Sequence, residues 1–422
     1  MLAMLVSFVD RQIIALVIEP MKADLGINDT QAGWLYSGFA LFYALAGYPL
    51  AWLADRKNRK IIVSIGIFFW SIFTMTCGVL RSFWPLFLAR VGVGVGEATL
   101  TPCAHSILGD VIPKHRIPLA FAIFQGGAIL GTGFAFMFGG IVVTFLRDAD
   151  PVNIPYFGLV GAWQLAFIYV GAPGLLVMLL MLSIREPMRL ASPEPRKDAE
   201  SRNKLIEFYS QNWKTIAFHH GGFMMLVMMG YAFVFWTPSF FERVHDIPAE
   251  RASIIYGLTF IVAGAFGTSS SAILAQRLMK KGRQDAMLVV AIAGAIGLVG
   301  TVLTIQLAQT ALVAFLIYIP ALVFLNVPFG LGFGALPLIA PPEVRAQVAA
   351  IYMLILSVGN ALGPPLTGWL SDNIFTERGG IIYSLVVITG LFGTIGIILL
   401  WMGRRAFAES LVRAGSVEPA VS

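Results

Sequence analysis

Charged residues are scarce in this sequence. Asp, Glu, Lys and Arg make up only 12% of its 422 residues, whereas 58% are hydrophobic. Average proteins carry roughly a quarter charged residues, so a soluble globular fold is excluded and a protein with many membrane-spanning segments is indicated. The 43 Gly and 22 Pro agree with this class, because small residues let helices pack closely in lipid and kinks are tolerated there.

Cysteine and histidine are also rare, which excludes several kinds of site. The two cysteines, Cys77 and Cys103, lie inside apolar segments, so we expect buried free thiols that say nothing about the redox compartment. No histidine has ligand spacing with carboxylates, and no nucleophile–base set is visible, so we expect no enzyme, no metal and no cofactor. The histidines are His105, His115, His219, His220 and His245. The net charge of +6 does not indicate nucleic-acid binding, because the distribution of the basic residues explains it.

Apolar runs of about 18 residues or more recur along the chain, and each can cross a membrane as a helix. The runs are continuous and too long for barrel strands, so we expect an all-α membrane protein. The expected helices lie near 1–18, 32–54, 61–80, 84–109, 117–146, 162–184, 216–240, 252–276, 285–307, 311–339, 346–371 and 380–403. The first run begins at residue 1 and shows no cleavage site, so we expect a retained helix and leave the natural start of the chain open.

Basic residues concentrate on one side of these twelve segments. The loops after the even-numbered segments, together with the C-terminus, hold 21 of the 29 Lys and Arg residues. The positive-inside rule then predicts that both termini are cytoplasmic. We expect a multi-pass protein of the cell membrane, which is the inner membrane if the source is bacterial.

The longest polar interval, 185–215, divides the segments six and six. Its residues 204–209 favour a short amphipathic helix on the membrane surface, and a solvated linker is the alternative interpretation. The expected organisation is a first six-helix half, a linker, a second half and a cytoplasmic tail. Their ranges are 1–184, 185–215, 216–403 and 404–422.

An internal repeat relates the two halves. Residues 51–56 (Ala-Trp-Leu-Ala-Asp-Arg) match 272–277 (Ala-Ile-Leu-Ala-Gln-Arg) six segments later. The alternating glycines of 92–96 likewise match those of 330–334, and Pro113-x-x-Arg116 matches Pro342-x-x-Arg345. Three matches in the same order predict a pseudo-two-fold axis along the membrane normal, which is the architecture of two-halved alternating-access transporters.

Four ionisable residues lie inside apolar segments of the first half, where charge is expensive and marks a substrate or proton pathway. Asp10 and Arg11 are adjacent in the first segment, and Arg90 and Glu97 share a helix face in the fourth. Helix direction places Asp10, Arg11 and Glu97 near mid-membrane and Arg90 nearer the outside, so we expect the four to line one half of a central cavity. The alternative is that Asp10 and Arg11 only hold helices together. For Gly92, Gly94 and Gly96 the preferred interpretation is close helix packing.

The second half has no charged residue in its apolar segments. It offers the candidate substrate contacts Tyr231, Trp236, Asn326 and Asn360, together with many Phe and Met side chains such as Met353. Each of these aromatic and Met side chains has core packing as its alternative role. A cavity with one charged wall and one apolar wall suits an amphiphile with a charged head and a long tail.

The run Asp55-Arg56-Lys57-Asn58-Arg59-Lys60 closely resembles the cytoplasmic signature of the major facilitator superfamily. Ala51 and Asn58 replace the two glycines of that signature; Asn tolerates a left-handed backbone, so a tight turn is retained. The resemblance implies a cytoplasmic gate in which Asp55 meets the start of the eleventh segment. The gate residues are Asp55, Arg56, Arg59 and Asp110, with Arg59 paired to Asp110. The alternative is an exposed basic turn that only fixes topology.

Further stretches are similar to the spinster family of lipid transporters within this superfamily. These are Asp10-Arg11, residues 55–60, Phe69-Trp70-Ser71, residues 90–98, Arg185-Glu186-Pro187, Gly363-Pro364 and Gly368-x-x-Ser371-Asp372. The resemblance implies a major facilitator fold of twelve helices in two halves. It also implies transport of lysophospholipids or sphingosine-1-phosphate-like lipids, in some members coupled to protons.

The combined prediction is a monomeric secondary transporter whose partners are protons, membrane lipids and an anionic lipid-like substrate. We expect Glu97 and Asp10 to carry the proton, and Arg11, Arg90 and Glu97 to bind the head group. Glu97 is expected to be the less compensated acid, because Arg90 is two helical turns away. The main alternative is a proton-coupled organic-anion or drug transporter of the same superfamily, and a non-transporting sensor is another. No residue names the substrate or the direction and stoichiometry of coupling.

Overall fold

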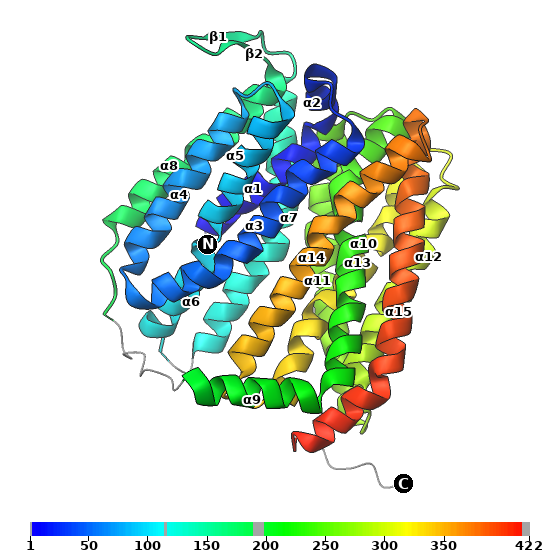
Figure 1. The fold of residues 1–422 in the computed structure, drawn as a ribbon. Helices are drawn as coiled ribbons and strands as arrows, with labels where there is room; N and C mark the ends of the chain where they lie inside the picture. The colour runs from blue at the N-terminus through cyan, green and yellow to red at the C-terminus, as the bar shows by residue number, and fades with distance from the viewer. Residues whose placement is uncertain (1, 114–115, 189–197, 416–422) are drawn as a thin grey trace. The chain divides into compact units, whose positions relative to one another are not determined.

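The computed structural model describes residues 2–113, 116–188 and 198–415, and nearly all of them are helical (Figure 1). The first half contains α1 (Leu2–Leu16), α2 (Ile18–Leu25), α3 (Asp29–Arg56), α4 (Arg59–Cys77), α5 (Phe83–Glu97), α6 (Leu100–Val111), α7 (Ile117–Leu146) and α8 (Ala162–Ser183). The strands β1 (Val152–Ile154) and β2 (Gly158–Val160) separate α7 from α8. After them come α9 (Asp198–Gln211), α10 (Trp213–His245), α11 (Ala249–Lys280), α12 (Ala286–Ile305), α13 (Ala311–Ile339), α14 (Arg345–Asn373), the 3₁₀ helix η2 (Arg378–Gly380) and α15 (Ile381–Arg413).

All twelve expected segments are helical. Nine helices of the described chain are long and apolar enough to cross a membrane. The other three segments correspond to α1, to α5 with α6, and to α7, of which Leu130–Leu146 forms an apolar stretch. The final helix continues to Arg413, beyond the expected boundary at 403. Two hydrogen bonds stabilise its last turns: one joins Ser410 to Thr215 of α10, and the other runs from Arg413 to the side-chain oxygen of Asn212, just before α10.

The chain forms two compact units. Unit 1 joins Met1–Pro193 with Phe235–Ile261 and Pro364–Ile381, and unit 2 contains the remainder. Unit 1 therefore includes parts of α10, α11 and α14 in addition to the first six segments. The contacts that hold these parts together are described below as an outer ion-pair network.

Close helix packing in unit 1 depends on the glycines of α5. A Cβ atom at Gly94 would lie 2.4 Å from the backbone oxygen of Phe39 in α3, and one at Gly96 would lie 2.9 Å from Trp70 in α4. Both distances are too short for any side chain, which agrees with the packing role expected for these residues. Trp70 is fully buried beside this contact.

The fourth expected segment is broken between α5 and α6. Glu97 is the last residue of α5, and α6 begins at Leu100. Pro102 has no N–H with which to continue the helical ladder to Ala98, which accounts for a break at this point. The hydroxyl of Thr99 instead donates to the carbonyl of Gly96 at 2.8 Å. Glu97 therefore lies at a helix end and not in the middle of a continuous helix.

Asn58 has a different role from the one expected of it. Its backbone is not left-handed, with φ of −66° and ψ of 112°. Its side-chain oxygen accepts a hydrogen bond from the N–H of Ile61 at 3.0 Å, so Asn58 caps the start of α4. The expectation of a left-handed turn was therefore wrong, and an N-cap explains why Asn is suitable here.

The two strands form a hairpin that the sequence did not predict. β1 and β2 pair antiparallel with Val152 opposite Val160. The hairpin and α2 lie at the same end of unit 1 (Figure 1). Arg81 donates to the carbonyls of Phe157 and Leu159 at 2.8 Å each, which ties the hairpin to the start of α5.

In unit 2, α9 lies across the direction of the long helices (Figure 1). Phe208 on α9 is buried, whereas Ile206 is 56% exposed. The helix thus presents apolar residues on more than one side, as a helix at a membrane surface can.

Candidate functional site

An ion pair between Arg11 of α1 and Glu97 of α5 forms the centre of the candidate site. The Nε of Arg11 lies 2.7 Å from Oε2 of Glu97, and the same oxygen accepts a hydrogen bond of 2.6 Å from the hydroxyl of Ser7. The Glu97 side chain is fully buried, whereas that of Arg11 is 19% exposed. Arg11 is therefore the member of the pair that a bound molecule can reach.

Three aromatic rings surround the guanidinium of Arg11. Its central carbon lies 4.9 Å from the ring centroid of Phe8, 5.1 Å from that of Phe39 and 4.6 Å from that of Tyr43. Each of these distances allows a cation–π interaction. The rings hold the planar group in a defined orientation, which favours recognition of an anion by paired N–H groups.

Asp10 and Arg90 form a second buried cluster beside the first. Thr74 donates to Oδ2 of Asp10 at 3.2 Å, and Nη1 of Arg90 donates to the backbone oxygen of Asp10 at 3.1 Å. Both charged side chains are fully buried. Oδ1 of Asp10 and the Nε and Nη2 atoms of Arg90 have no hydrogen-bond partner among the described residues. Such groups are costly in a low dielectric and are typical of functional sites.

The partners of the two acids differ from those expected. We expected Glu97 to be the less compensated acid, but Glu97 contacts both Arg11 and Ser7. Asp10 has only Thr74 as a side-chain partner in the described structure. The spacing within one helix could not reveal this, because the partner of Glu97 comes from α1 and not from α5.

The candidate residues of the second half are divided between the two units. Trp236 belongs to unit 1, where its indole is fully buried and donates to the carbonyl of Pro364 at 2.9 Å. Asn326 belongs to unit 2 and donates to the carbonyl of Leu322 at 2.9 Å. Asn360 also belongs to unit 2, and its side-chain oxygen is buried without a partner in the described part of the chain.

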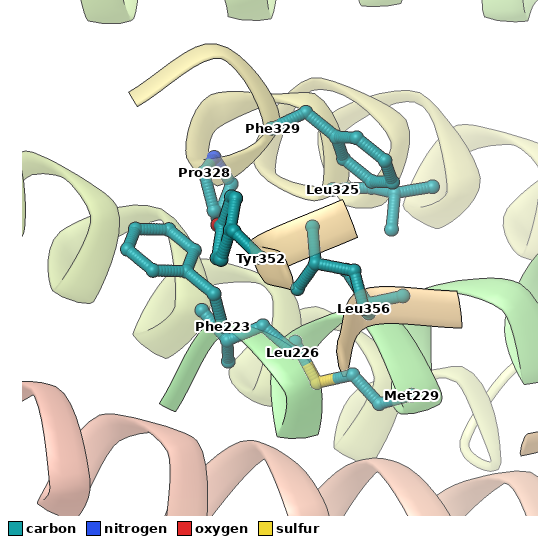
Figure 2. A pocket seen from close by; sticks show the side chains of 9 residues that line it. Phe223, Leu226, Met229, Leu325, Pro328, Phe329, Tyr352 and Leu356 are labelled. Carbon is teal, nitrogen blue, oxygen red and sulfur yellow. The ribbon is translucent and has the colours of Figure 1, made fainter. Parts of the chain in front are cut away.

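Unit 2 contains a narrow apolar cavity between α10, α13 and α14. Its lining is Phe223, Leu226, Val227, Met229, Leu325, Pro328, Phe329, Tyr352 and Leu356 (Figure 2). Tyr231 lies close by, with its ring centroid 6.2 Å from that of Phe329. The cavity volume of about 20 Å³ is roughly the space of one water molecule, so it holds no bulky group without rearrangement.

Arg59, the first residue of α4, is the centre of a buried network. Its guanidinium forms an ion pair with Asp110 of α6, the pairing that the superfamily resemblance implies, and donates to Ser106 at 2.9 Å. It also lies 2.9 Å from Glu186. Arg56 points elsewhere: it is exposed and stacks 4.1 Å from the ring centroid of Trp52. The side chain of Asp55 lies outside the described part of the structure.

Glu186 is a member of this network that the gate assignment omitted. Partial burial alone would raise the pKa of Glu186 by disfavouring the ionised form. Hydrogen bonds from the Arg59 side chain and from the backbone N–H groups of Lys60 and Arg59 stabilise the ionised form more strongly. The pKa of the carboxyl therefore lies below its ordinary value. The signal for Glu186 in the sequence was Arg185-Glu186-Pro187, one of the stretches that resemble the spinster family.

A second network, which we call the outer ion-pair network, was not predicted. Arg243 of α10 contacts Glu19 at 2.7 Å and Asp29 at 2.6 Å, and Lys22 also pairs with Asp29. Asp372 of α14 accepts hydrogen bonds from the backbone N–H groups at the start of α3, at 3.0 and 2.7 Å. A carboxylate at a helix N-terminus is stabilising there. These contacts join helices from both halves inside unit 1.

Replacing Arg243 with Gln is expected to weaken the outer ion-pair network. The Arg243 side chain is only 8% exposed, and its removal leaves two carboxylates without their main partner, a loss of roughly 3–5 kcal/mol in buried pairs. Distances between spin labels on the outer ends of α3 and α14 should become longer and broader than in the wild type. An unchanged distance distribution would show that Arg243 does not hold these ends together.

No group of three or more His, Cys, Asp or Glu side chains suited to a metal ion occurs among the described residues. Some buried charges of unit 1 are paired, Arg11 with Glu97 and Arg59 with Asp110 and Glu186. Asp10 has only the hydroxyl of Thr74 as a side-chain partner in the described structure. Buried charges inside apolar helices are typical of substrate or proton pathways in membrane proteins.

Comparison with known proteins gives the class. Residues 1–339 match the profile of the Major Facilitator Superfamily, and the chain belongs to that superfamily of transporters. The chain is thus a multi-pass membrane transporter with the twelve-helix fold of that superfamily, and not an enzyme.

Within the superfamily, the spinster resemblance is confirmed. A crystal structure of a bacterial homologue of the human lysosomal transporter spinster, inward-facing and unoccupied, is similar at a TM-score of 0.82 and 28% identity, covering 97% of this chain and 96% of that one. The sphingosine-1-phosphate transporter SPNS2 of Danio rerio is 25% identical over 87% of this chain and 74% of its own length. An MFS-type efflux pump of Mycolicibacterium smegmatis is 24% identical over 96% of this chain and 91% of its own length.

Proposed function

We propose that this transporter moves an amphiphilic anionic lipid, of the lysophospholipid or sphingosine-1-phosphate kind, by proton-coupled alternating access. The observation that carries the proposal is Arg11: partly exposed, oriented by three aromatic rings and paired with the buried Glu97. An arginine fork suits a phosphate or carboxylate head group. Arg90 is part of the same charged cluster and stabilises its geometry through the backbone of Asp10.

The lipid-like character of the substrate is supported by the second half. Tyr231, Asn326 and Asn360 are its few polar candidates, and its apolar segments are rich in Phe and Met side chains. We propose that apolar residues of this kind take the hydrocarbon tail. SPNS2 of Danio rerio, a similar protein, is named for transport of such a lipid.

Proton coupling is supported by the burial of two acids in one cluster. Asp10 and Glu97 are both inaccessible to solvent, and the Arg11–Glu97 pair can exist only while Glu97 is ionised. Protonation of Glu97 would release Arg11 to the head group, and deprotonation would recapture it. We further propose a monomer in the cell membrane with both termini in the cytoplasm.

The alternative is a proton-coupled transporter of organic anions or drugs. It is favoured by the similarity to an efflux pump over nearly the full length of both chains. A proteoliposome uptake screen of lysolipids, sphingoid phosphates and small organic anions, with and without a pH gradient, separates the two functions. Uptake of organic anions alone would contradict the lipid proposal.

Asp55→Ala is expected to weaken the state in which the cytoplasmic side is closed. The proposed role of this carboxylate is to meet a helix N-terminus of the other half, where a negative charge is favourable. Cross-linking between the cytoplasmic ends of the two halves should fall relative to wild type, with Asp150→Ala in the loop before β1 as a matched control. Unchanged cross-linking in Asp55→Ala would exclude the gate role.

A further inference from the structure

Unit 2 contains a second cavity, at the end of the bundle that the basic loops mark as cytoplasmic. It has a volume of about 680 Å³ and lies between α10, the loop from α11 to α12, and α15. Its lining includes Phe218 of α10 and Asp285 of the loop. The final helix contributes Trp401 and Arg405. It is open to the surface and is much larger than the apolar cavity of the same unit.

The wall of this cavity carries excess positive charge. Arg404 forms an ion pair with Asp285 and lies 4.3 Å from the ring centroid of Trp401. Arg283 also contacts Asp285, at 2.9 Å. The carboxylate therefore holds two arginines at the rim but neutralises only one charge. Arg405 is exposed, and its guanidinium has no hydrogen bond or ion pair within the described part of the chain.

An apolar surface continues directly from these charges. Trp401 is 59% exposed and Met402 is 56% exposed, and both line the cavity. Tryptophan is enriched at the membrane–water interface, where its ring lies at the level of lipid head groups. A small soluble anion would gain nothing from this surface, whereas a lipid can place its head on the arginines and its chains along the apolar side.

We propose that this cavity binds the head group of an anionic phospholipid from the surrounding leaflet. The phosphate is bound by Arg405 and by the free N–H groups of Arg404, and the acyl chains pack along Trp401 and Met402. Basic pockets between helices on the cytoplasmic side are the sites at which such lipids are recognised. This lipid is distinguished from the proposed cargo by the residues that bind its head group: Arg404 and Arg405 belong to unit 2, whereas Arg11 belongs to unit 1.

Native mass spectrometry of the purified, delipidated protein tests the assignment. Phosphatidylglycerol and phosphatidylcholine of equal chain length are titrated into wild type, Arg405→Gln, Trp401→Ala and Arg251→Gln. Arg251 is an exposed arginine of α11 in unit 1, so its variant controls for the loss of one charge. Arg405 is exposed, so its variant is expected to fold normally.

We expect wild type to bind phosphatidylglycerol more tightly than phosphatidylcholine. Arg405→Gln should lower that affinity roughly fivefold, the typical effect of one basic residue near an anionic lipid, and Arg251→Gln should not. Trp401→Ala should weaken both lipids. Equal binding of the two lipids by wild type, or equal loss in Arg405→Gln and Arg251→Gln, would overturn the proposal. Displacement of the lipid by millimolar inorganic phosphate would do the same, by assigning the site to a free anion.

Discussion

Glu97→Gln should abolish the response of uptake to an imposed pH gradient while leaving substrate binding intact. The Glu97 carboxylate accepts hydrogen bonds from Arg11 and Ser7, and glutamine has nearly the same size without the charge. The variant resembles the protonated state, in which Arg11 is available to the head group. A transporter fixed in that state cannot exchange a proton at this position, so an inward gradient gives no acceleration.

The measurement is substrate uptake into proteoliposomes with and without a pH gradient, together with equilibrium binding. Asp10→Asn is the informative comparison, because it removes the neighbouring buried acid and should impair both binding and coupling. Ser7→Ala keeps the charge of Glu97 and removes only one hydrogen bond, so its gradient response should persist. If uptake by the Glu97→Gln variant is still fully driven by the pH gradient, Glu97 is not the proton site, and Asp10 becomes the first candidate.

Arg11→Lys should lose at least about tenfold in substrate affinity although the charge is kept. Lysine cannot form two parallel N–H contacts with a phosphate or carboxylate, and it lacks the planar group that the rings of Phe8, Phe39 and Tyr43 surround. The shorter reach of its ammonium group also weakens the pair with Glu97. The loss should appear for every anionic lipid that binds, irrespective of chain length.

Equilibrium binding of a lysolipid to purified wild type and Arg11→Lys measures this effect. Arg251→Lys makes the same exchange at an exposed position of α11 and should bind like wild type. Tyr43→Phe keeps a ring beside the guanidinium and should retain most of the affinity. Equal binding by Arg11→Lys and wild type would exclude a bidentate role for Arg11.

The charged cluster of the first half was accessible from sequence because charge inside an apolar segment is rare and costly. Asp10, Arg11, Arg90 and Glu97 are conspicuous for that reason, and helix direction predicts that Asp10, Arg11 and Glu97 lie near mid-membrane. The pairing within the cluster was not accessible. Whether Arg11 reaches Asp10 or Glu97 depends on how α1 is rotated against α5, and spacing along one helix does not fix that rotation.

The outer ion-pair network could not be predicted from the sequence. Glu19, Asp29 and Arg243 lie at the ends of helices, where charged residues are ordinary and give no signal. Their meeting depends on the packing of distant segments. The break after Glu97 could have been predicted, because Pro102 is a helix-breaking residue within the run 84–109. The length of that apolar run favoured one continuous helix instead.

The break after Glu97 is a point at which the fourth segment can bend more easily than a continuous helix. An intact helix resists bending because each turn is braced by its backbone hydrogen bonds, but the joint after Glu97 already lacks one of them at Pro102. About 13 residues separate the joint from Asp110, a reach of roughly 20 Å, so a tilt of about 10° would carry Asp110 through roughly 3 Å. That displacement is enough to part Asp110 from Arg59. Glu97, the proposed proton site, and Asp110, a proposed gate residue, therefore lie near opposite ends of the same short helix, α6.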